Sequence, residues 1–581
     1  MGRGKTKHRA RGAVQASSVA ADVSKSPASP APTWEAWLFP LLLVVAGIVA
    51  YANSLGGPFV LDDTASIANN GSLRGGPVGA LFPPANGETV TGRPLVNFSF
   101  WVNYHLDALA GGDGLRVGGY HAVNLLIHVT AALLLFGAVR RALMLPSLRG
   151  KFAGREAAIA FVAALLWLLH PLQTESVTYL AQRAESLMGR FYIAAFYAFV
   201  RGVEKPGRGK WLAASAAACW LGVLCKEVMV TAPVMLLFFD RAFVAGSFAN
   251  AWRARNKFYV AAFASWIPLA GLVLAAGSRG GSAGFGTAAD PMAYLLTQTR
   301  AVVDYLQLSI WPSPLVFDYG PKLVGGFGEV PLQFCVVLLL LAGTVWLACK
   351  MPKAGFLAAW FFVTLAPSSS IVPIATEAMA EHRMYVSLAA LSVLAALALD
   401  VLGKKRATLG VGIILACVLG LATMARNTDY QSALVLWRDT VTHRPDVARA
   451  HENYGAALLG EGQLAAAAAE FERAIVLQPD FPEAENNLGG ALARQGLVAE
   501  AVPHFAKAAE GLRLSHEKAM AYFNLGYALG QLGQYDKSVK ALEDCLKLEP
   551  GYPPAASTLA AARQKAGKQG GTPAAIPGKS S

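Results

Sequence analysis

The sequence predicts an all-α protein in two parts, a polytopic bundle of membrane helices followed by an α-solenoid of short helical repeats. The chain of 581 residues is 54% hydrophobic, with a mean hydropathy of +0.41. This composition is too apolar for a soluble protein of that length. Membrane-length apolar runs continue to about residue 425, and soluble helices with a regular period follow them.

Net charge and cysteine spacing exclude several classes of function. The formal charge is +13, but Lys and Arg lie in short loops between apolar runs, so membrane topology accounts for them and nucleic acid is not an expected partner. The six cysteines have no paired spacing, so neither a disulfide framework nor a zinc site is expected.

The amino-terminal region predicts a tail and an anchor. Residues 1–33 are basic and rich in Ser, Ala and Pro, which is typical of a disordered cytoplasmic tail. The first apolar run, from Trp34 to about Ala52, lacks a convincing cleavage site, so we interpret it as an uncleaved signal anchor.

Ten further apolar runs complete a membrane domain over residues 34–425, with about eleven spans in total. They lie near 119–139, 157–176, 186–200, 211–224, 228–240, 258–276, 331–349, 355–372, 384–402 and 407–425. With eleven spans the basic loops all fall on one side, together with the amino terminus, and the positive-inside rule makes that side cytoplasmic. The remaining polar segments therefore face away from the cytoplasm: residues 53–118, the run from His170, Lys226-Glu227, the 277–330 loop, and Glu377 to Arg383.

The soluble part, residues 426–563, carries an internal repeat. The triplets that end in Gly455 and Gly489 are about 34 residues apart, and a third ends in Gly526. The same register aligns other positions: Gly462 with Gly496 and Gly533, Phe471 with Phe505 and Leu542, and Ala474 with Ala508 and Cys545. This pattern is typical of tetratricopeptide repeats, in which small residues let paired helices approach closely. We expect units at about 447–480, 481–514 and 518–551, a partial unit before 447 that pairs with the last span, and a disordered tail over 564–581.

Two adjacent carboxylates, Asp62 and Asp63, stand just beyond the first span in the predicted loop 53–118. An ionised Asp beside a membrane can accept the proton of an attacking hydroxyl, as a general base does. A turn or a helix cap would use the same residues. The dipeptide alone does not decide between these interpretations.

Several ordered motifs together resemble one family. They are YANSLGGPFVLDD, GRPLVNFSFWVNYHLDAL, GYHAVNLLIHV, HPLQTESVTYLAQRAESL, KEVMVTAPVMLLFFD and EHRMY, followed by the repeats. From about Trp34 to Pro554 the chain resembles the transmembrane and tetratricopeptide repeat containing proteins, which are polytopic O-mannosyltransferases of the GT-C type, and their bacterial relatives. The resemblance implies a polyprenyl-phosphate sugar as donor, a protein Ser or Thr hydroxyl as acceptor, and catalytic acids in the first extracytoplasmic loop, where Asp62 and Asp63 stand.

These expectations lead to further candidate residues on the carboxylate side. A phosphate leaves without an acid, so one base suffices and direct displacement predicts inversion at the anomeric carbon. Cations alone can hold a monophosphate, so we expect no cofactor and no metal. The candidates for the donor phosphate are Arg383, Lys226, Arg183 and Arg93, although each is equally interpretable as snorkelling at the membrane interface. Supporting acids and histidines are Glu175, Glu227, Glu381, His121, His128, His170 and His382.

Other functions remain open from the sequence. One is a non-catalytic membrane anchor that displays the repeats as a protein-binding scaffold, and another is a ligase or polymerase of lipid-linked glycans. A solute transporter is disfavoured because no inverted repeat is visible. The expected partners are a polyprenyl-phosphate sugar lipid and extracytoplasmic acceptor proteins bound through the repeats. The expected location is the inner membrane of a bacterium, towards which the Ala- and Gly-rich composition points, or the endoplasmic reticulum membrane of a eukaryote.

Overall fold

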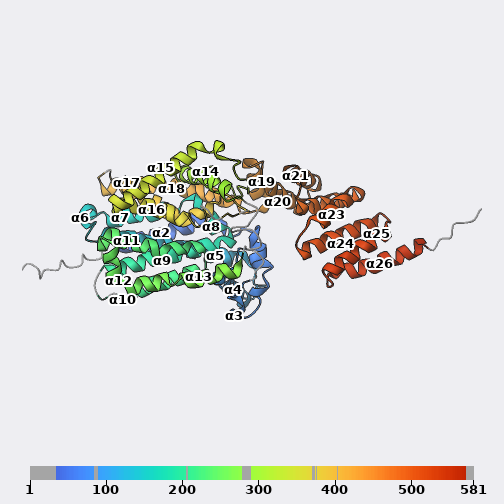
Figure 1. Cartoon of the computed structure of the whole chain (residues 1–581), viewed down its shortest axis with the longest axis horizontal. Coiled ribbons are helices and arrows are strands. Elements are labelled where there is room, and N and C mark those ends of the chain that lie inside the picture. Colours follow the sequence, from blue (N-terminus) through green and yellow to red (C-terminus); the bar gives the residue numbers. More distant parts are fainter. Residues whose placement is uncertain are drawn as a thin grey trace, which may run out of the picture.

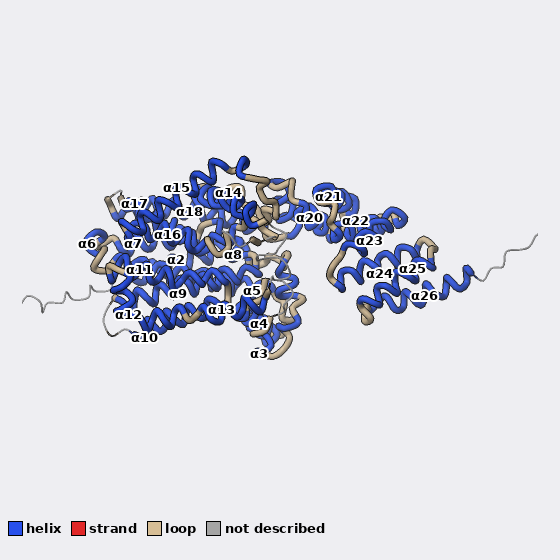
Figure 2. The backbone as a smooth tube through the Cα atoms, in the orientation of Figure 1, coloured by secondary structure: helices blue, strands red, loops and turns tan. Residues whose placement is uncertain are grey.

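The computed structural model describes residues 34–83, 89–204, 207, 209–277, 290–369, 373–374, 376–401 and 403–570. These residues form helices, turns and loops without a β-strand (Figure 2), so the predicted all-α class is confirmed. The predicted tail 1–33 lies outside them. At the other end, α26 (Pro553–Gly570) is helical past residue 564, where the tail was expected to begin, because Ala, Lys and Gln favour a helix.

The chain is an integral, multi-pass membrane protein, and each of the eleven predicted runs overlaps at least one helix. Seven helices in the described part of the chain are long and apolar enough to cross a membrane, or eight if the pair Glu156–Leu168 and Pro171–Thr178, bent by 57°, is one span. The runs that do not pass this test form α9, which begins with charged residues, and the shorter α10 and α16. The bundle helices are α2 (Glu35–Tyr51), α5 (Val117–Leu143), α7 (Glu156–Leu168), α8 (Thr174–Thr178), α9 (Arg183–Val203), α10 (Gly209–Val223), α11 (Ala232–Asp240), α12 (Phe248–Phe263), α13 (Trp266–Ala276), α15 (Pro331–Lys350), α16 (Pro352–Leu365), α17 (Met384–Asp400) and α18 (Lys405–Asp429).

One helix stands where only a loop was expected. Within 277–330, α14 (Pro291–Ile310) buries Tyr294, Gln298, Ala301 and Tyr305, which recur at helical spacing. Gln, Thr, Arg and Asp along the same stretch lower its hydropathy, so a search for apolar runs does not detect it.

Side-chain contacts define the two ends of the bundle. At one end Lys405 pairs with Glu35, and at the other the Asn427 amide donates to the Ala50 carbonyl at 2.9 Å. Helices α2 and α18 therefore run parallel, and the solenoid begins at the end opposite to the start of α2 (Figure 1). The segment α6 (Arg149–Phe152), in the predicted basic loop 140–155, lies at the end away from the solenoid.

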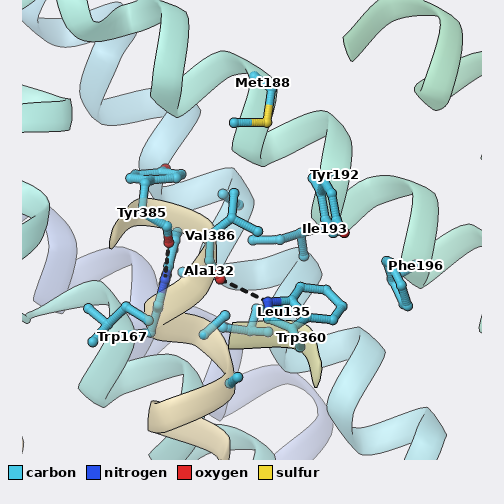
Figure 3. Packing of buried hydrophobic residues seen from close by; sticks show 14 of the residues in the cluster. Ala132, Leu135, Trp167, Met188, Tyr192, Ile193, Phe196, Trp360, Tyr385 and Val386 are labelled. Carbon is cyan, nitrogen blue, oxygen red and sulfur yellow. Dashed lines mark hydrogen bonds between the residues drawn. The ribbon is translucent and has the colours of Figure 1, made fainter. Parts of the chain in front are cut away.

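Between these ends the core packs apolar side chains around the start of α17. The indoles of Trp167 and Trp360 donate to the backbone oxygens of Tyr385 and Val386, both at 2.9 Å (Figure 3). Buried indole N–H groups need such acceptors. These two bonds fix α7 and α16 against α17.

The solenoid consists of paired helices: α20 (Ala448–Gly460) with α21 (Leu464–Leu477), α22 (Pro482–Arg494) with α23 (Val498–Gly511), and α24 (Ser515–Gln531) with α25 (Tyr535–Leu548). A Cβ atom on Gly455 or Gly489 would lie 2.7 or 2.8 Å from the ring of Phe471 or Phe505. The predicted close approach of paired helices at small residues is thus made by a glycine of one helix and a phenylalanine of the other. A single helix, α19 (Ala433–His443), precedes the first pair.

Candidate active site at the solenoid end of the bundle

The described residues of the predicted first loop, 53–83 and 89–118, form helices and turns at the solenoid end. The loop contains η1 (Ala52–Ser54), η2 (Thr64–Ala68), η3 (Gly71–Leu73), α3 (Pro77–Ala80) and α4 (Pro94–Leu109). Inside it the Asn97 amide donates to the Ala80 carbonyl and accepts from the Asn70 amide, both at 2.8 Å. These buried bonds give the loop a defined shape, which a site for catalysis requires.

Asp63 is enclosed by backbone groups from two segments. Its side chain is fully buried, Oδ1 accepts from the Ala181 N–H at 2.6 Å, and Oδ2 accepts from the Val60 N–H at 3.1 Å. Burial raises the pKa of Asp63 to about 8, against the lowering effect of these N–H donors. Asp63 therefore ties the first loop to the segment that precedes α9.

Asp62 has a different environment. It is partly exposed, and Oδ2 accepts a hydrogen bond from the Thr89 hydroxyl at 2.5 Å. Leu61, just before it, has φ of 45°, a left-handed conformation that is costly for a residue with a Cβ. This turn lies directly before the carboxylate pair. Of the two acids, Asp62 is the one that is not fully buried.

Arg183 is completely enclosed. Its guanidinium donates to the side-chain oxygens of Asn103 and Asn124, both at 2.6 Å, and to the Tyr120 carbonyl at 2.9 Å. Its Cζ lies 4.4 Å from the centre of the Phe100 ring. In this structure Arg183 joins α9 to α4 and α5 and offers nothing to a phosphate.

Arg93 directly precedes α4 in the first loop, and Lys226 lies next to Glu227, the carboxylate neighbour of Arg93. Arg93 donates to the Thr89 carbonyl at 2.8 Å, and its guanidinium is 3.8 Å from the Glu227 carboxylate. Lys226 Nζ is 2.5 Å from Glu185, and both side chains are buried. Arg93 also holds the segment that carries Thr89, the hydrogen-bond donor to Asp62.

The segment before α17 brings together more of the predicted residues. Glu175 Oε2 accepts from the His382 backbone N–H at 2.8 Å, and Oε1 is 2.7 Å from His382 Nδ1. Arg383 donates to the Glu377 carbonyl at 2.7 Å. Its side chain is 1% exposed, and its carboxylate neighbour is Glu377 at 3.9 Å.

Glu381 instead contacts the loop after α14. Its Oε1 accepts from the Val316 N–H at 2.6 Å and from the Tyr319 hydroxyl at 3.0 Å.

Two of the predicted histidines, His121 and His170, contact backbone groups in separate parts of the structure. His121 Nε2 is 3.0 Å from the Gly57 carbonyl, and His170 Nδ1 accepts from the Leu172 N–H at the start of η4 (Pro171–Gln173). His170 thus caps a short helix.

His128 lies deeper in the bundle than the other histidines. Its Nε2 is 3.0 Å from the Leu168 carbonyl, and its Nδ1 is 3.0 Å from the Tyr385 hydroxyl. Both contacts belong to the packing of α5 against α7 and α17. His128 therefore stands apart from the carboxylate pair.

The first solenoid helices pack directly on the loop that carries the carboxylates. Val60, Tyr179, Phe317, Tyr430 and Trp437 form one buried apolar cluster. The Tyr179 hydroxyl accepts from the Asp62 backbone N–H at 3.1 Å. The bundle, the loop after α14 and the solenoid therefore share one core next to Asp62.

An ion pair between a half-buried Arg449 and a buried Asp318 strengthens this junction. Arg449 of α20 donates to both oxygens of Asp318, at 2.7 and 2.8 Å, in the bidentate geometry that makes such pairs strong. Asp62 and Glu377 also lie close enough to Arg449 for their charges to interact with it. The repeats thus contribute a cation to the neighbourhood of the candidate base.

Sequence reasoning missed several residues of this site, among them Arg426, Asp318 and Arg449. Arg426, at the end of α18, donates through Nη1 to Asp429 and Asp439, both at 3.0 Å. Its Nε and Nη2 atoms have no partner within the part of the chain that the structure describes. Arg426, Lys226 and Arg383 all lie within electrostatic range of Glu175. Arg426 ends an apolar run, a position that resembles ordinary snorkelling, and only the fold shows its neighbours.

Known proteins match the chain in two ways, through a repeat family and through several named relatives. Residues 425–480 and 480–548 each match a family described as tetratricopeptide repeat. Protein O-mannosyl-transferase Tmtc2 of Drosophila melanogaster is 28% identical over 332 residues, which is 53% of this chain and 33% of that protein. Protein O-mannosyl-transferase Tmtc3 of the same organism is 34% identical over 215 residues, 33% of this chain and 23% of the relative. Human protein O-mannosyl-transferase TMTC4 is 27% identical over 219 residues, 34% of this chain and 29% of the relative.

The predicted resemblance is confirmed by these relatives, and the chain spans about a third or less of their length. Among solved structures, ArnT from Cupriavidus metallidurans bound to undecaprenyl phosphate is 16% identical, with 87% of this chain and 90% of that chain covered and a TM-score of 0.39. The Archaeoglobus fulgidus oligosaccharyltransferase in the apo form is 12% identical, with 68% and 57% covered and a TM-score of 0.37. At these scores the likenesses carry no weight for function.

Proposed function

We propose that this protein is a membrane glycosyltransferase that moves a sugar, mannose or another hexose, from a polyprenyl-phosphate donor to Ser or Thr hydroxyls of extracytoplasmic proteins. The similarity to relatives named protein O-mannosyl-transferases supports the reaction class. The observation that carries the site is the partly exposed Asp62 at the junction between the bundle and the first solenoid helices.

In the proposed reaction Asp62 is the general base. A Ser or Thr oxygen attacks the anomeric carbon, the bond from that carbon to the phosphate oxygen breaks, and the hydroxyl proton passes to the Asp62 carboxylate. The bonding electron pair leaves with the polyprenyl phosphate. A single displacement inverts the anomeric centre. The Thr89 hydroxyl holds Asp62 Oδ2, so the second oxygen of the carboxylate is the one assigned to the substrate.

The leaving phosphate requires positive charge nearby. Lys226, Arg383 and Arg426 lie within electrostatic range of Glu175, and Arg93 holds the Thr89 segment next to Asp62. We assign the phosphate to this group, with Arg426 first because two of its nitrogen atoms have no partner among the described residues. Cations in a site with little water stabilise a developing phosphate charge strongly, so the proposal includes no metal.

The acceptor reaches Asp62 along the solenoid. Stacked helix pairs form an extended concave surface suited to a polypeptide, and α19 and α20 join that surface to the loop next to Asp62. A polypeptide bound to the repeats would thus present its Ser or Thr side chain beside the base.

Glycoproteomics tests this function against the scaffold and the glycan ligase. Envelope proteins would be compared between cells with the gene, cells without it, and cells that carry only the Asp62→Asn variant. The proposal predicts that a hexose on Ser or Thr is lost in the last two. Glycosylation that persists with Asp62→Asn would favour a scaffold, and loss of a lipid-linked polymer without any change in proteins would favour a ligase or polymerase.

A further inference from the structure

A cavity of about 790 Å³ lies at the end of the bundle away from the solenoid. Its walls come from α5, α9, α11, α16 and α17, and residues 147–152 border one side. The residues of α5 that line it, Leu135 to Leu143, follow His121 by roughly 21 to 33 Å along the helix at 1.5 Å per residue. The cavity is therefore separate from the candidate active site.

The inner wall of this cavity is apolar. Leu135, Ile193, Phe196 and Trp360 converge there (Figure 3), and the Trp360 indole N–H is already bonded to the Val386 carbonyl. Leu394, on the lining, is 53% exposed, so the cavity opens towards the surroundings of the bundle. The volume is within the range of about 300–1,000 Å³ typical of ligand pockets. Such walls suit a hydrocarbon chain rather than a polar solute.

The rim of the cavity carries positive charge. Lys151 and Lys353 are its charged lining residues, and both are exposed. Lys353 Nζ is 3.2 Å from the Ser147 carbonyl, and Lys151 Nζ is 5.5 Å from the centre of the Phe152 ring. No ion pair to either lysine occurs in the described ranges. Two cations that have no acidic partner among the described residues, beside an apolar cavity, complement an anionic headgroup attached to a hydrocarbon chain.

We propose that this cavity binds one anionic phospholipid from the membrane leaflet at this end of the bundle. An acyl chain fills the space next to Trp360, and the headgroup phosphate lies against Lys151 and Lys353. The sugar donor is a different lipid, because its phosphate must reach the opposite end, where Asp62 lies. This binding is therefore independent of the proposed glycosyl transfer.

Native mass spectrometry of the full chain in detergent tests the proposal. The probes are phosphatidylglycerol and phosphatidylcholine with the same acyl chains, at equal concentrations. We expect at least a five-fold preference for phosphatidylglycerol, and the double variant Lys151→Gln with Lys353→Gln should remove it. Lys350→Gln, a nearby cation outside the lining, is the matched control and should keep the preference.

A second variant tests the chain-binding part without a change of charge. Ala142 lines the cavity and is only partly buried, so Ala142→Phe should be accommodated and should lower retention of both lipids at least three-fold. Equal loss in the Lys350→Gln control, or full retention in the double variant, would overturn the proposal. The proposal would also be overturned if binding of undecaprenyl phosphate depended on Lys151 and Lys353 while binding of phosphatidylglycerol did not.

Discussion

At the scale of single residues, the adjacent acids Asp62 and Asp63 have different environments. The sequence predicted an acidic pair in the first loop, but it did not show that Asp63 is fully buried and Asp62 partly exposed. The shortest hydrogen bond of Asp63 comes from the Ala181 N–H, 118 positions away in the sequence, and no local pattern reveals it. The same limit applies to Arg183, whose partners lie on α4 and α5.

Stability should depend on pH through Asp63. Its pKa is raised to about 8 by burial from an ordinary value of 3.8, so between these values the folded protein holds a proton that the unfolded chain releases. This contribution to stability is therefore complete at low pH and falls as the pH rises to about 8. Asp63→Asn removes it and also places an amide donor against the N–H groups, which costs about 1–3 kcal/mol.

Thermal unfolding of the purified protein between pH 5 and pH 8.5 measures this effect. We expect the Asp63→Asn variant to have the lower Tm, by a margin that shrinks as the pH rises. Other buried acids titrate in both proteins and cancel in the comparison. A margin independent of pH would show that Asp63 stays ionised in the folded protein.

At the scale of elements, apolar runs and repeat spacing predicted most helices because burial in a membrane and helix pairing both leave a local pattern. Gly455 lies against Phe471 and Gly489 against Phe505 in the structure, so equivalent positions of the predicted register make equivalent contacts. Helix α14 escaped detection because its buried face includes Thr297 and Gln298. Long apolar runs predict spans, whereas a helix packed through polar residues needs the tertiary structure.

The contact between helices within a repeat leads to a prediction for two neighbouring glycines. Gly489→Ala would put a Cβ 2.8 Å from the Phe505 ring, and such overpacking costs about 1–3 kcal/mol. Gly490→Ala is the matched control, because a Cβ there meets nothing within 4 Å, and replacing a helical glycine gains about 0.5–1 kcal/mol. Limited proteolysis of the full chain should show faster cleavage of the solenoid in the first variant alone. Equal rates in the two variants would contradict this account of the helix contact.

At the scale of the whole molecule, the solenoid is part of the structure around Asp62. Helices α19 and α20 reach the loop next to Asp62 through Trp437 and through the Arg449–Asp318 pair. The repeat pattern predicted the solenoid, and the span pattern predicted the bundle. Of their junction, the sequence predicted only that the partial unit before 447 pairs with the last span, and Arg426 of α18 does contact Asp439 of α19. The contact with the loop after α14 was not predictable, because Phe317 and Asp318 lie in a loop without any pattern that points to the repeats.

A truncation can separate the docked helices from the rest of the solenoid. Deleting residues 464–581 keeps α19 and α20 on the bundle, so the protein should stay folded and should still bind the donor. Because the rest of the solenoid is missing, the KM for protein acceptors should rise and their turnover should fall at least ten-fold. Deleting from residue 430 also removes Trp437 and Arg449 and should impair donor turnover onto a short peptide as well. Glycosyl transfer by both forms to a short peptide and to a full-length acceptor measures the difference. Identical behaviour of the two truncations would refute a role for α19 and α20 at the site.

The central claim is that Asp62 accepts the hydroxyl proton while Asp63 holds the loop, and reconstituted turnover tests it most directly. Purified wild type, Asp62→Asn and Asp63→Asn would be placed in liposomes with a polyprenyl-phosphate sugar and a Ser/Thr peptide, and kcat would be measured at saturating donor. The account predicts that Asp62→Asn keeps the wild-type Tm and loses roughly 100-fold to 10,000-fold in kcat, the range that general-base catalysis supplies. The account would be contradicted if folded Asp62→Asn kept a near-normal kcat while Asp63→Asn, with the same Tm as the wild type, showed the large loss of kcat.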